Sequence, residues 1–204
     1  MPVVVNKSDI AELQFALAGI RGATKRVLTR TINRTMTQTR NFAQKEIRKD
    51  LNLPAKRVKK DFKIIKAYAG YPKGRIQATG KPVSLASYGA RQTNKGLSVI
   101  IRRSKGRKIW RHGFFAKVKG RKQPFWRAVE PPKRAKYRPK WKRRYPKFLY
   151  PYRPFFGPLE RLTGPRVEDE FIKKEVMEPT LKFAGDKFKD QLNKEMNYEI
   201  GRFK

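Results

Sequence analysis

Hydrophobic positions in the first quarter of the chain recur at helical spacing. Over residues 8–50 an apolar side chain returns every three or four positions, which predicts an amphipathic helix, and Ser8 is suited to cap its start. Gly19 and Gly22 weaken the helix and predict a bend or break near them. The apolar positions are Ile10, Leu13, Leu17, Ile20, Val27, Leu28, Ile32, Met36, Phe42 and Ile47.

The pattern changes to short apolar runs after residue 50. Residues 51–70 predict a short helix with Pro54 in its first turn, followed by a connector that enters a strand at Phe62. Residues 71–129 alternate runs such as RIQA, LSVIIRR and FFAKV with clusters of Gly, Asn and Lys. Such alternation is typical of antiparallel strands joined by turns, so we predict a small antiparallel β-sheet with basic turns.

Residues 158–204 return to helical periodicity. Acidic residues crowd the start of this segment, where they favour the helix dipole, and Pro179 predicts a kink or a division of the helix. Its acids have basic neighbours at helical spacing, which predicts that they lie on the solvated surface. The apolar face contains Phe171, Val176, Leu181, Phe183, Phe188 and Leu192. We expect residues 1–204 to form a single α+β domain.

Residues 130–157 fit neither pattern. The stretch KRAKYRPKWKRRYPKFLYPYRPFFG holds ten basic residues, eight aromatic residues, four prolines and no acid. Proline excludes regular helix and central strand, so an extended arm is predicted. The prolines of the whole segment are Pro131, Pro132, Pro139, Pro146, Pro151 and Pro154.

Three roles for this arm are open. In a nucleic-acid arm the cations would neutralise phosphates, but ring stacking needs unpaired bases that a duplex does not offer. In a membrane-surface arm Tyr, Trp and Lys would suit an anionic interface, but no amphipathic helix accompanies them. In a subunit-packing arm the rings supply buried area and Arg contacts carboxylates. We favour the packing arm, with contacts from Tyr137, Trp141, Arg143, Arg144, Tyr145, Phe148, Tyr150, Tyr152, Phe155 and Phe156.

Charge is distributed unevenly along the chain. The 204 residues hold 52 Lys plus Arg against 16 Asp plus Glu, a formal net charge of +36. Residues 160–204 are balanced, so residues 1–159 carry the whole excess, and Glu130 is the only acid between Phe62 and Leu159. A protein of this kind attracts polyanions or acidic partners.

Two sets of cations are candidates for such contacts. Arg26, Arg30 and Arg34 share one helical face, which is either a solvated face or a contact with a polyanion or an acidic partner. The second set lies in the basic turns of the predicted sheet, where side chains can hold phosphates without reading sequence. Its members are Arg102, Arg103, Lys105, Arg107, Lys108 and Arg111.

Catalytic and metal-binding chemistry finds little support. The absence of cysteine excludes disulfides and thiolate metal sites, and His112 is the only histidine. The segment GRIQATGK has the wrong glycine spacing for a phosphate loop, and Pro82 follows its lysine. No apolar run approaches the roughly 18–20 residues of a membrane span. We expect no cofactor, no metal, no catalytic residues and therefore no enzyme.

Three segments resemble a known family when they are taken in order. They are PVSLASYGARQTNKGLSV, the GFFA segment before a basic strand hairpin, and LTGPRV before the last helix. Together they make the chain similar, over roughly residues 10–185, to the minor tail protein Z family of long-tailed bacteriophages. The chain departs from that pattern at residues 130–157, where such proteins have a short connection.

The resemblance implies a structural virion protein that completes the head-proximal end of a phage tail. Such a protein would form a neck ring around the DNA channel, with six copies favoured. It would contact the tail terminator, the tail tube, the head-tail connector and, through phosphates, duplex DNA. It would be made and assembled in the host cytoplasm. Composition alone also fits a soluble nucleic-acid-binding protein of ribosomal or nucleoid type, against which the neutral C-terminal helix and the segment order count.

Overall fold

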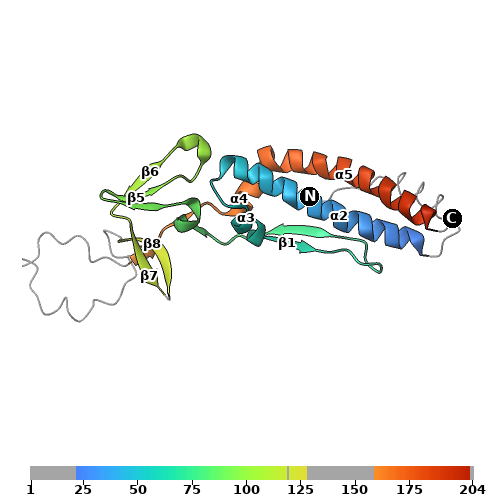
Figure 1. Cartoon of the computed structure of the whole chain (residues 1–204), viewed down its shortest axis with the longest axis horizontal. Helices are drawn as coiled ribbons and strands as arrows, with labels where there is room; N and C mark the ends of the chain where they lie inside the picture. The colour runs from blue at the N-terminus through green and yellow to red at the C-terminus, as the bar shows by residue number, and fades with distance from the viewer. Residues whose placement is uncertain (1–21, 119, 128–158, 203–204) are drawn as a thin grey trace, which may run out of the picture. The chain divides into compact units, whose positions relative to one another are not determined.

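The computed structural model describes residues 22–118, 120–127 and 159–202 (Figure 1). Ser8, Gly19 and the arm of residues 130–157, with all ten of its expected packing residues, lie outside the described residues. The α+β fold expected from the sequence is confirmed, since long helices accompany small antiparallel sheets.

The chain divides into two compact units. The first contains Met1–Pro82 and Pro165–Lys204, and the second contains Val83–Gly164. The first unit is therefore built from two segments of the chain that are far apart in sequence. Whether the two units fold together as one domain stays a prediction.

Two antiparallel helices dominate the first unit. Helix α2 spans Ala23–Asp50 and helix α5 spans Lys174–Gly201, and Figure 1 shows them side by side. The ring of Phe42 stacks on that of Phe183 with centroids 4.3 Å apart. Gly22 caps the start of α2 with φ 70°, a left-handed conformation that glycine adopts without strain. This agrees with the break predicted near Gly22.

The buried stripe of α2 is more polar than its apolar periodicity predicts. It repeats every four residues, and its centre is threonine, whereas Leu28, Ile32 and Phe42 are only half-buried. A spacing of four advances about 40° per step around a helix, so the stripe winds from one side to another. This fits the packing of α2, at different points along its length, against α5, α3 (Ala55–Asp61), α4 (Val167–Phe171) and the strands Phe62–Ile65 and Arg75–Ala78. The stripe contains Ala23, Val27, Thr31, Thr35, Thr39, Ala43 and Ile47.

The first unit also contains a short helix, a two-stranded hairpin and helix α4. Helix α3 spans Ala55–Asp61, and strands β1 (Phe62–Ile65) and β2 (Arg75–Ala78) pair antiparallel. The ring of Phe62 meets that of Phe171 edge-on at 5.3 Å. The short helix and the strand entry at Phe62 match the sequence predictions.

The division of the C-terminal helical segment lies earlier than predicted. Helix α4 spans Val167–Phe171, and α5 starts at Lys174 and runs without interruption through Pro179. Lys173 has an extended backbone, with φ −60° and ψ 138°, and this ends one helix and begins the next. Of the two alternatives predicted at Pro179, the division was wrong, and a kink there stays a prediction.

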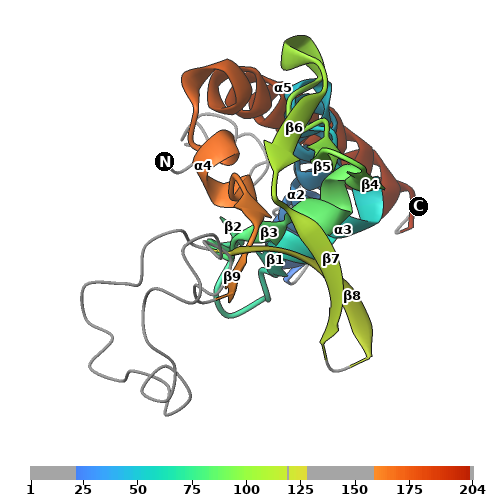
Figure 2. The same ribbon diagram turned by 90° about the vertical axis from the view of Figure 1, so that its left-hand side faces the viewer.

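The second unit consists of short antiparallel strands (Figure 2). Three sheets have the strand orders β10-β3, β4-β5-β6 and β7-β8-β9. The strands are β3 (Val83–Ser84), β4 (Arg91–Thr93), β5 (Gly96–Val99), β6 (Lys108–Arg111), β7 (Phe114–Val118), β8 (Arg121–Arg127), β9 (Leu159–Arg161) and β10 (Thr163–Gly164), with 3-10 turns η1 (Leu85–Tyr88) and η2 (Arg103–Lys105).

The motifs that carry the family resemblance hold the core of this unit. Leu85, Tyr88, Leu97 and Val99 are fully buried. A Cβ atom on Gly164 would lie 2.7 Å from the ring of Tyr88, so the glycine of LTGPRV lets strand β10 approach that ring. Among the described residues, no helix has the length and apolar character to cross a membrane.

Candidate nucleic-acid interface

The second unit combines a high positive charge with almost no acid. From Val83 to Arg127 the chain carries thirteen Lys or Arg and no Asp or Glu. Glu160 lies on the neighbouring strand β9, and its Oε2 accepts a hydrogen bond from Nε1 of Trp126 at 3.1 Å. Within the described part of this unit, cations therefore far outnumber carboxylates, a balance that is typical of surfaces that contact polyanions.

The β5-η2-β6 connection gathers the six cations predicted from the sequence. Arg103 and Lys105 are exposed in η2, and Nη1 of Arg107 lies 3.3 Å from Oγ of Ser98. Lys108 and Arg111 are exposed at the two ends of β6, three positions apart, so they project from opposite faces of the sheet. Arg102 precedes η2. One connection thus presents charge to both faces of its sheet.

The β7-β8 hairpin places two lysines directly opposite each other. Lys117 pairs with Lys122 in the antiparallel register, both are exposed, and Nζ of Lys122 lies 5.0 Å from the ring centroid of Phe115. Like charges that face each other across two strands destabilise the pair. A phosphate bound between them would remove that repulsion. The hairpin is therefore a candidate phosphate site that the sequence analysis missed, although the register around Gly120 in FFAKVKGRK could have shown it.

The three arginines of α2 have an acidic partner within the chain. Nε and Nη2 of Arg26 lie 2.9 and 2.7 Å from Oε1 of Glu199, and Nη1 of Arg30 lies 2.9 Å from its Oε2. Arg34 pairs with Glu195. The hydrogen bond from Arg26 lowers the pKa of Glu199 below its ordinary value, against the opposing effect of burial.

This arrangement corrects the expectation of solvated C-terminal acids for three of them, whereas Asp169, Glu175, Glu178, Asp186 and Asp190 are exposed as expected. The side chains of Glu195 and Glu199 are 1% and 0% exposed, and Glu170 is also buried, beside Lys173. Since the charges of Arg26, Arg30 and Arg34 are partly neutralised inside the first unit, the second unit carries the larger uncompensated positive charge. A contact of these arginines with DNA stays a prediction.

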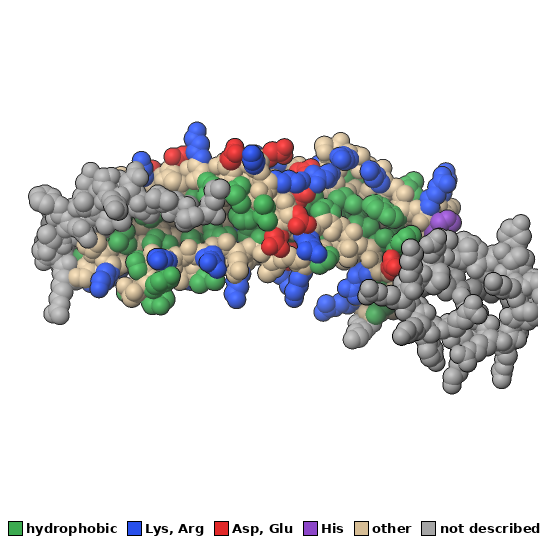
Figure 3. Space-filling model, turned by 180° about the vertical axis from the view of Figure 1, so that it is seen from behind, with side chains coloured by type: hydrophobic (Ala, Val, Ile, Leu, Met, Phe, Trp, Pro, Cys, Tyr) green, Lys and Arg blue, Asp and Glu red, His purple; other side chains and the backbone are tan. Residues whose placement is uncertain are grey.

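The face drawn in Figure 3 shows the same imbalance. Lys and Arg side chains project along both edges of the described surface, while the acidic ones gather along one edge and near the middle. No described residue between Phe62 and Leu159 is Asp or Glu. Most of the described acidic side chains therefore belong to the helices.

Comparison with known proteins identifies the family. The family described as prophage minor tail protein Z (GPZ) matches residues 16–203. The chain belongs to this family. It is a structural protein of a phage tail, present in the virion, whose partners are other tail proteins. No curated protein and no solved structure matches the chain significantly.

A metal-binding cluster is not found in the part of this tail protein that the structure describes. No group of three or more His, Cys, Asp or Glu side chains gathers there. His112 is exposed in the turn between β6 and β7, with φ 61°. The cationic surface of the second unit is the candidate binding surface of this minor tail protein.

Proposed function

We propose that this minor tail protein completes the head-proximal end of the tail. It forms a homo-oligomeric ring, with six copies favoured, around the channel through which DNA passes. The cations of the β5-η2-β6 connection and the β7-β8 hairpin contact the phosphates of the duplex. The observation that supports this most strongly is the facing pair Lys117 and Lys122 in a unit with almost no acid.

Phosphate contacts suit a channel better than base contacts. A channel must pass an entire genome, so it cannot depend on sequence, and phosphate contacts carry no sequence information directly. Lysine contacts exchange readily and weaken as salt rises, because each contact releases condensed counterions. Such contacts steady the duplex and let it slide.

The excess charge also requires acidic neighbours. Each copy carries +36, and a ring multiplies that charge at one place. Carboxylate-bearing surfaces on the tail terminator, the tail tube and the head-tail connector would offset the repulsion. We therefore expect assembly with these partners to weaken as salt rises.

The arm of residues 130–157 packs on a neighbouring subunit and adds positive charge to the joint. Its rings supply buried area, and its prolines limit the entropy lost on docking. A chain that lacks residues 131–156 is expected to assemble poorly. Normal tails from that chain would contradict the packing role.

A complementation experiment tests the proposed position in assembly. Cells producing the phage without this gene are expected to accumulate filled heads and separate tails. Adding the purified protein should then join them. Tails that join heads without the protein, or tails that never polymerise at all, would contradict a role in completing the head-proximal end.

Binding to nucleic acid separates this proposal from a ribosomal or nucleoid role. The tail protein should bind duplex DNA weakly and in a salt-sensitive way, without preference for structured RNA. Tight binding of structured RNA by a monomer that ignores tail tubes would favour the other role.

A further inference from the structure

The turn of the β1-β2 hairpin presents two tyrosines to solvent on a fixed support. The side chains of Tyr68 and Tyr71 are 64% and 49% exposed, with ring centroids 6.0 Å apart. Their backbones pair through hydrogen bonds of 3.3 and 2.9 Å. The side chain of Asn33 on α2 donates to the carbonyl of Ala67 at 3.0 Å and accepts from its N–H at 2.9 Å. Because α2 pins the hairpin here, the tyrosines lose little freedom on docking.

Lysines flank the two tyrosines in the sequence. Lys66 and Lys73 are exposed, and Nζ of Lys73 lies 5.2 Å from the ring centroid of Tyr71. The hairpin contains no acid. We call Lys66, Tyr68, Tyr71 and Lys73 the tyrosine tip. Aromatic residues surrounded by a polar rim are typical of protein–protein interfaces. The positive charge of this rim favours a partner surface that carries carboxylates.

The first unit itself carries a surface of that kind where α4 meets α5. Residues 168–178 hold five acids and two lysines, and Nζ of Lys173 is bound to Glu170 at 2.5 Å. Ile172 is 60% exposed. We call Asp169, Ile172, Glu175 and Glu178 the acidic strip. All four are exposed, and none of the three carboxylates forms an ion pair within the described residues.

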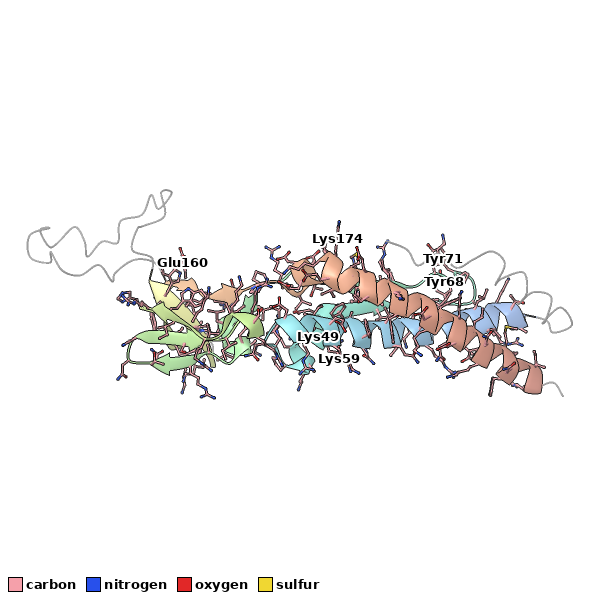
Figure 4. All side chains as sticks on the ribbon, turned by 90° about the horizontal axis from the view of Figure 1, so that it is seen from above. Lys49, Lys59, Tyr68, Tyr71, Glu160 and Lys174 are labelled. Atoms are coloured by element: carbon pink, nitrogen blue, oxygen red, sulfur yellow. The ribbon has the colours of Figure 1, made fainter. Side chains whose placement is uncertain are left out.

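The two surfaces cannot meet within one chain. The ring of Phe62, at the start of the hairpin, touches Phe171 beside the acidic strip. Tyr68 lies six residues further along the hairpin, which is about 20 Å at the rise of an extended chain. Figure 4 shows Tyr68 and Tyr71 at the turn, away from Lys174 at the start of α5. The complementary surface must therefore come from another molecule.

We propose that the tyrosine tip of one copy docks on the acidic strip of the next copy. Ile172 would face the tyrosine rings, and Glu175 and Glu178 would face Lys66 and Lys73. This inference rests on the proposed homo-oligomeric ring and supplies its contact. The contact joins two different surfaces, and such a heterologous contact generates a ring when its rotation closes.

Duplex DNA explains the two surfaces less well. Phosphates would satisfy the lysines of the tip, but tyrosine stacking needs unpaired bases. DNA also gives the acidic strip no partner. A second copy satisfies both surfaces at once.

Charge exchange tests the contact. We expect Lys66→Glu with Lys73→Glu to weaken self-association roughly tenfold or more, because four carboxylates then face one another. Glu175→Lys with Glu178→Lys should weaken it similarly, and a mixture or combination of the two double variants should restore it. The matched control is Lys59→Glu with Lys60→Glu on α3, which makes the same change at exposed lysines elsewhere. Association is measured by native mass and sedimentation, alone and on tail tubes, with circular dichroism to confirm folding.

Cysteine cross-linking gives a second readout, since the natural chain has no cysteine. A chain with Ala69→Cys and Ile172→Cys should oxidise to a ladder of cross-linked copies that ends at the size of the ring. Ala69→Cys with Ser104→Cys is the control and should not form the ladder.

The outcomes separate this contact from the ring itself. Loss of association in both charge variants with recovery on recombination supports the contact. Rings that form equally well in all variants, or a Lys66→Glu, Lys73→Glu variant that loses only DNA binding, would overturn it. A ladder that stops at dimers supports the contact and contradicts the ring. A wild-type chain that stays monomeric in solution and on tail tubes contradicts both.

Discussion

Arg26 donates two hydrogen bonds to Glu199, whose side chain is fully buried where α5 packs on α2. The two residues stand 173 positions apart in the sequence. Arg30 binds the other carboxylate oxygen of Glu199 at 2.9 Å. A buried carboxylate that has lost its water depends on these partners. The contact therefore ties the start of α2 to the end of α5.

Removing the charge of Glu199 should destabilise the protein. We expect Glu199→Gln to lower the free energy of unfolding by about 1–2 kcal/mol, because hydrogen bonds to charged groups are lost while both arginines keep access to water. Urea unfolding measures the change. Glu178→Gln, at an exposed position of the same helix, should change stability by less than about 0.5 kcal/mol. Equal effects of the two variants would show that the arginine contacts contribute nothing.

The same carboxylate should make stability depend on pH. The pKa of Glu199 is lowered in the folded state from the ordinary value of 4.5, so the unfolded chain takes up the proton first as pH falls. Its contribution is fully present above about pH 4.5 and is lost as pH falls towards the lowered pKa. Between pH 7 and pH 3, the free energy of unfolding should therefore fall less for Glu199→Gln than for the wild type. An equal fall in the two proteins would contradict this.

Two glycines should respond oppositely to alanine. In Gly164→Ala the new Cβ would lie 2.7 Å from the ring of Tyr88, and such overpacking costs about 1–3 kcal/mol. Gly185 lies inside α5, and a Cβ atom added there would have no neighbour within 4 Å, so Gly185→Ala should stabilise by about 0.5–1 kcal/mol. Thermal unfolding of both variants measures the contrast. Stabilisation by Gly164→Ala would show that strand β10 does not need its close approach.

Substitution of the facing lysines should raise the stability of the hairpin and weaken DNA binding. Lys117→Glu turns a like-charge pair into an opposite-charge pair with Lys122, which should stabilise the hairpin by a few tenths to about 1 kcal/mol. The same change should weaken duplex binding. For Lys117→Ala with Lys122→Ala, the slope of log K against log salt should become shallower by about two. Lys59→Ala with Lys60→Ala is the control. A variant that gains stability and keeps its full DNA affinity would show that the pair does not hold phosphate.

Local sequence patterns predicted the elements of this fold well. Helix α2 ends at Asp50 as expected, α3 follows Pro54, and RIQA and FFAKV form β2 and β7. These elements depend on periodicity, proline and turn residues that act over a few positions. The residues that give each of these signals lie within the element or next to it in the sequence.

Features that depend on distant partners were not predictable in this way. Thr31, Thr35 and Thr39 are buried because several elements pack around α2, and a count of apolar residues passes over them. Glu195 and Glu199 have lysines or an arginine nearby in sequence, yet their partners come from α2. By contrast, the pairing of Lys117 with Lys122 is local, and the register of the turn at Gly120 could have shown it.

The position of the protein in the virion decides whether it completes the head-proximal end of the tail. Particles assembled with a gold-labelled copy of the full chain can be imaged by electron microscopy. Our account predicts label at the junction of head and tail, in a ring around the tail axis. Label spread along the tube, or gathered at the distal tip, would contradict it.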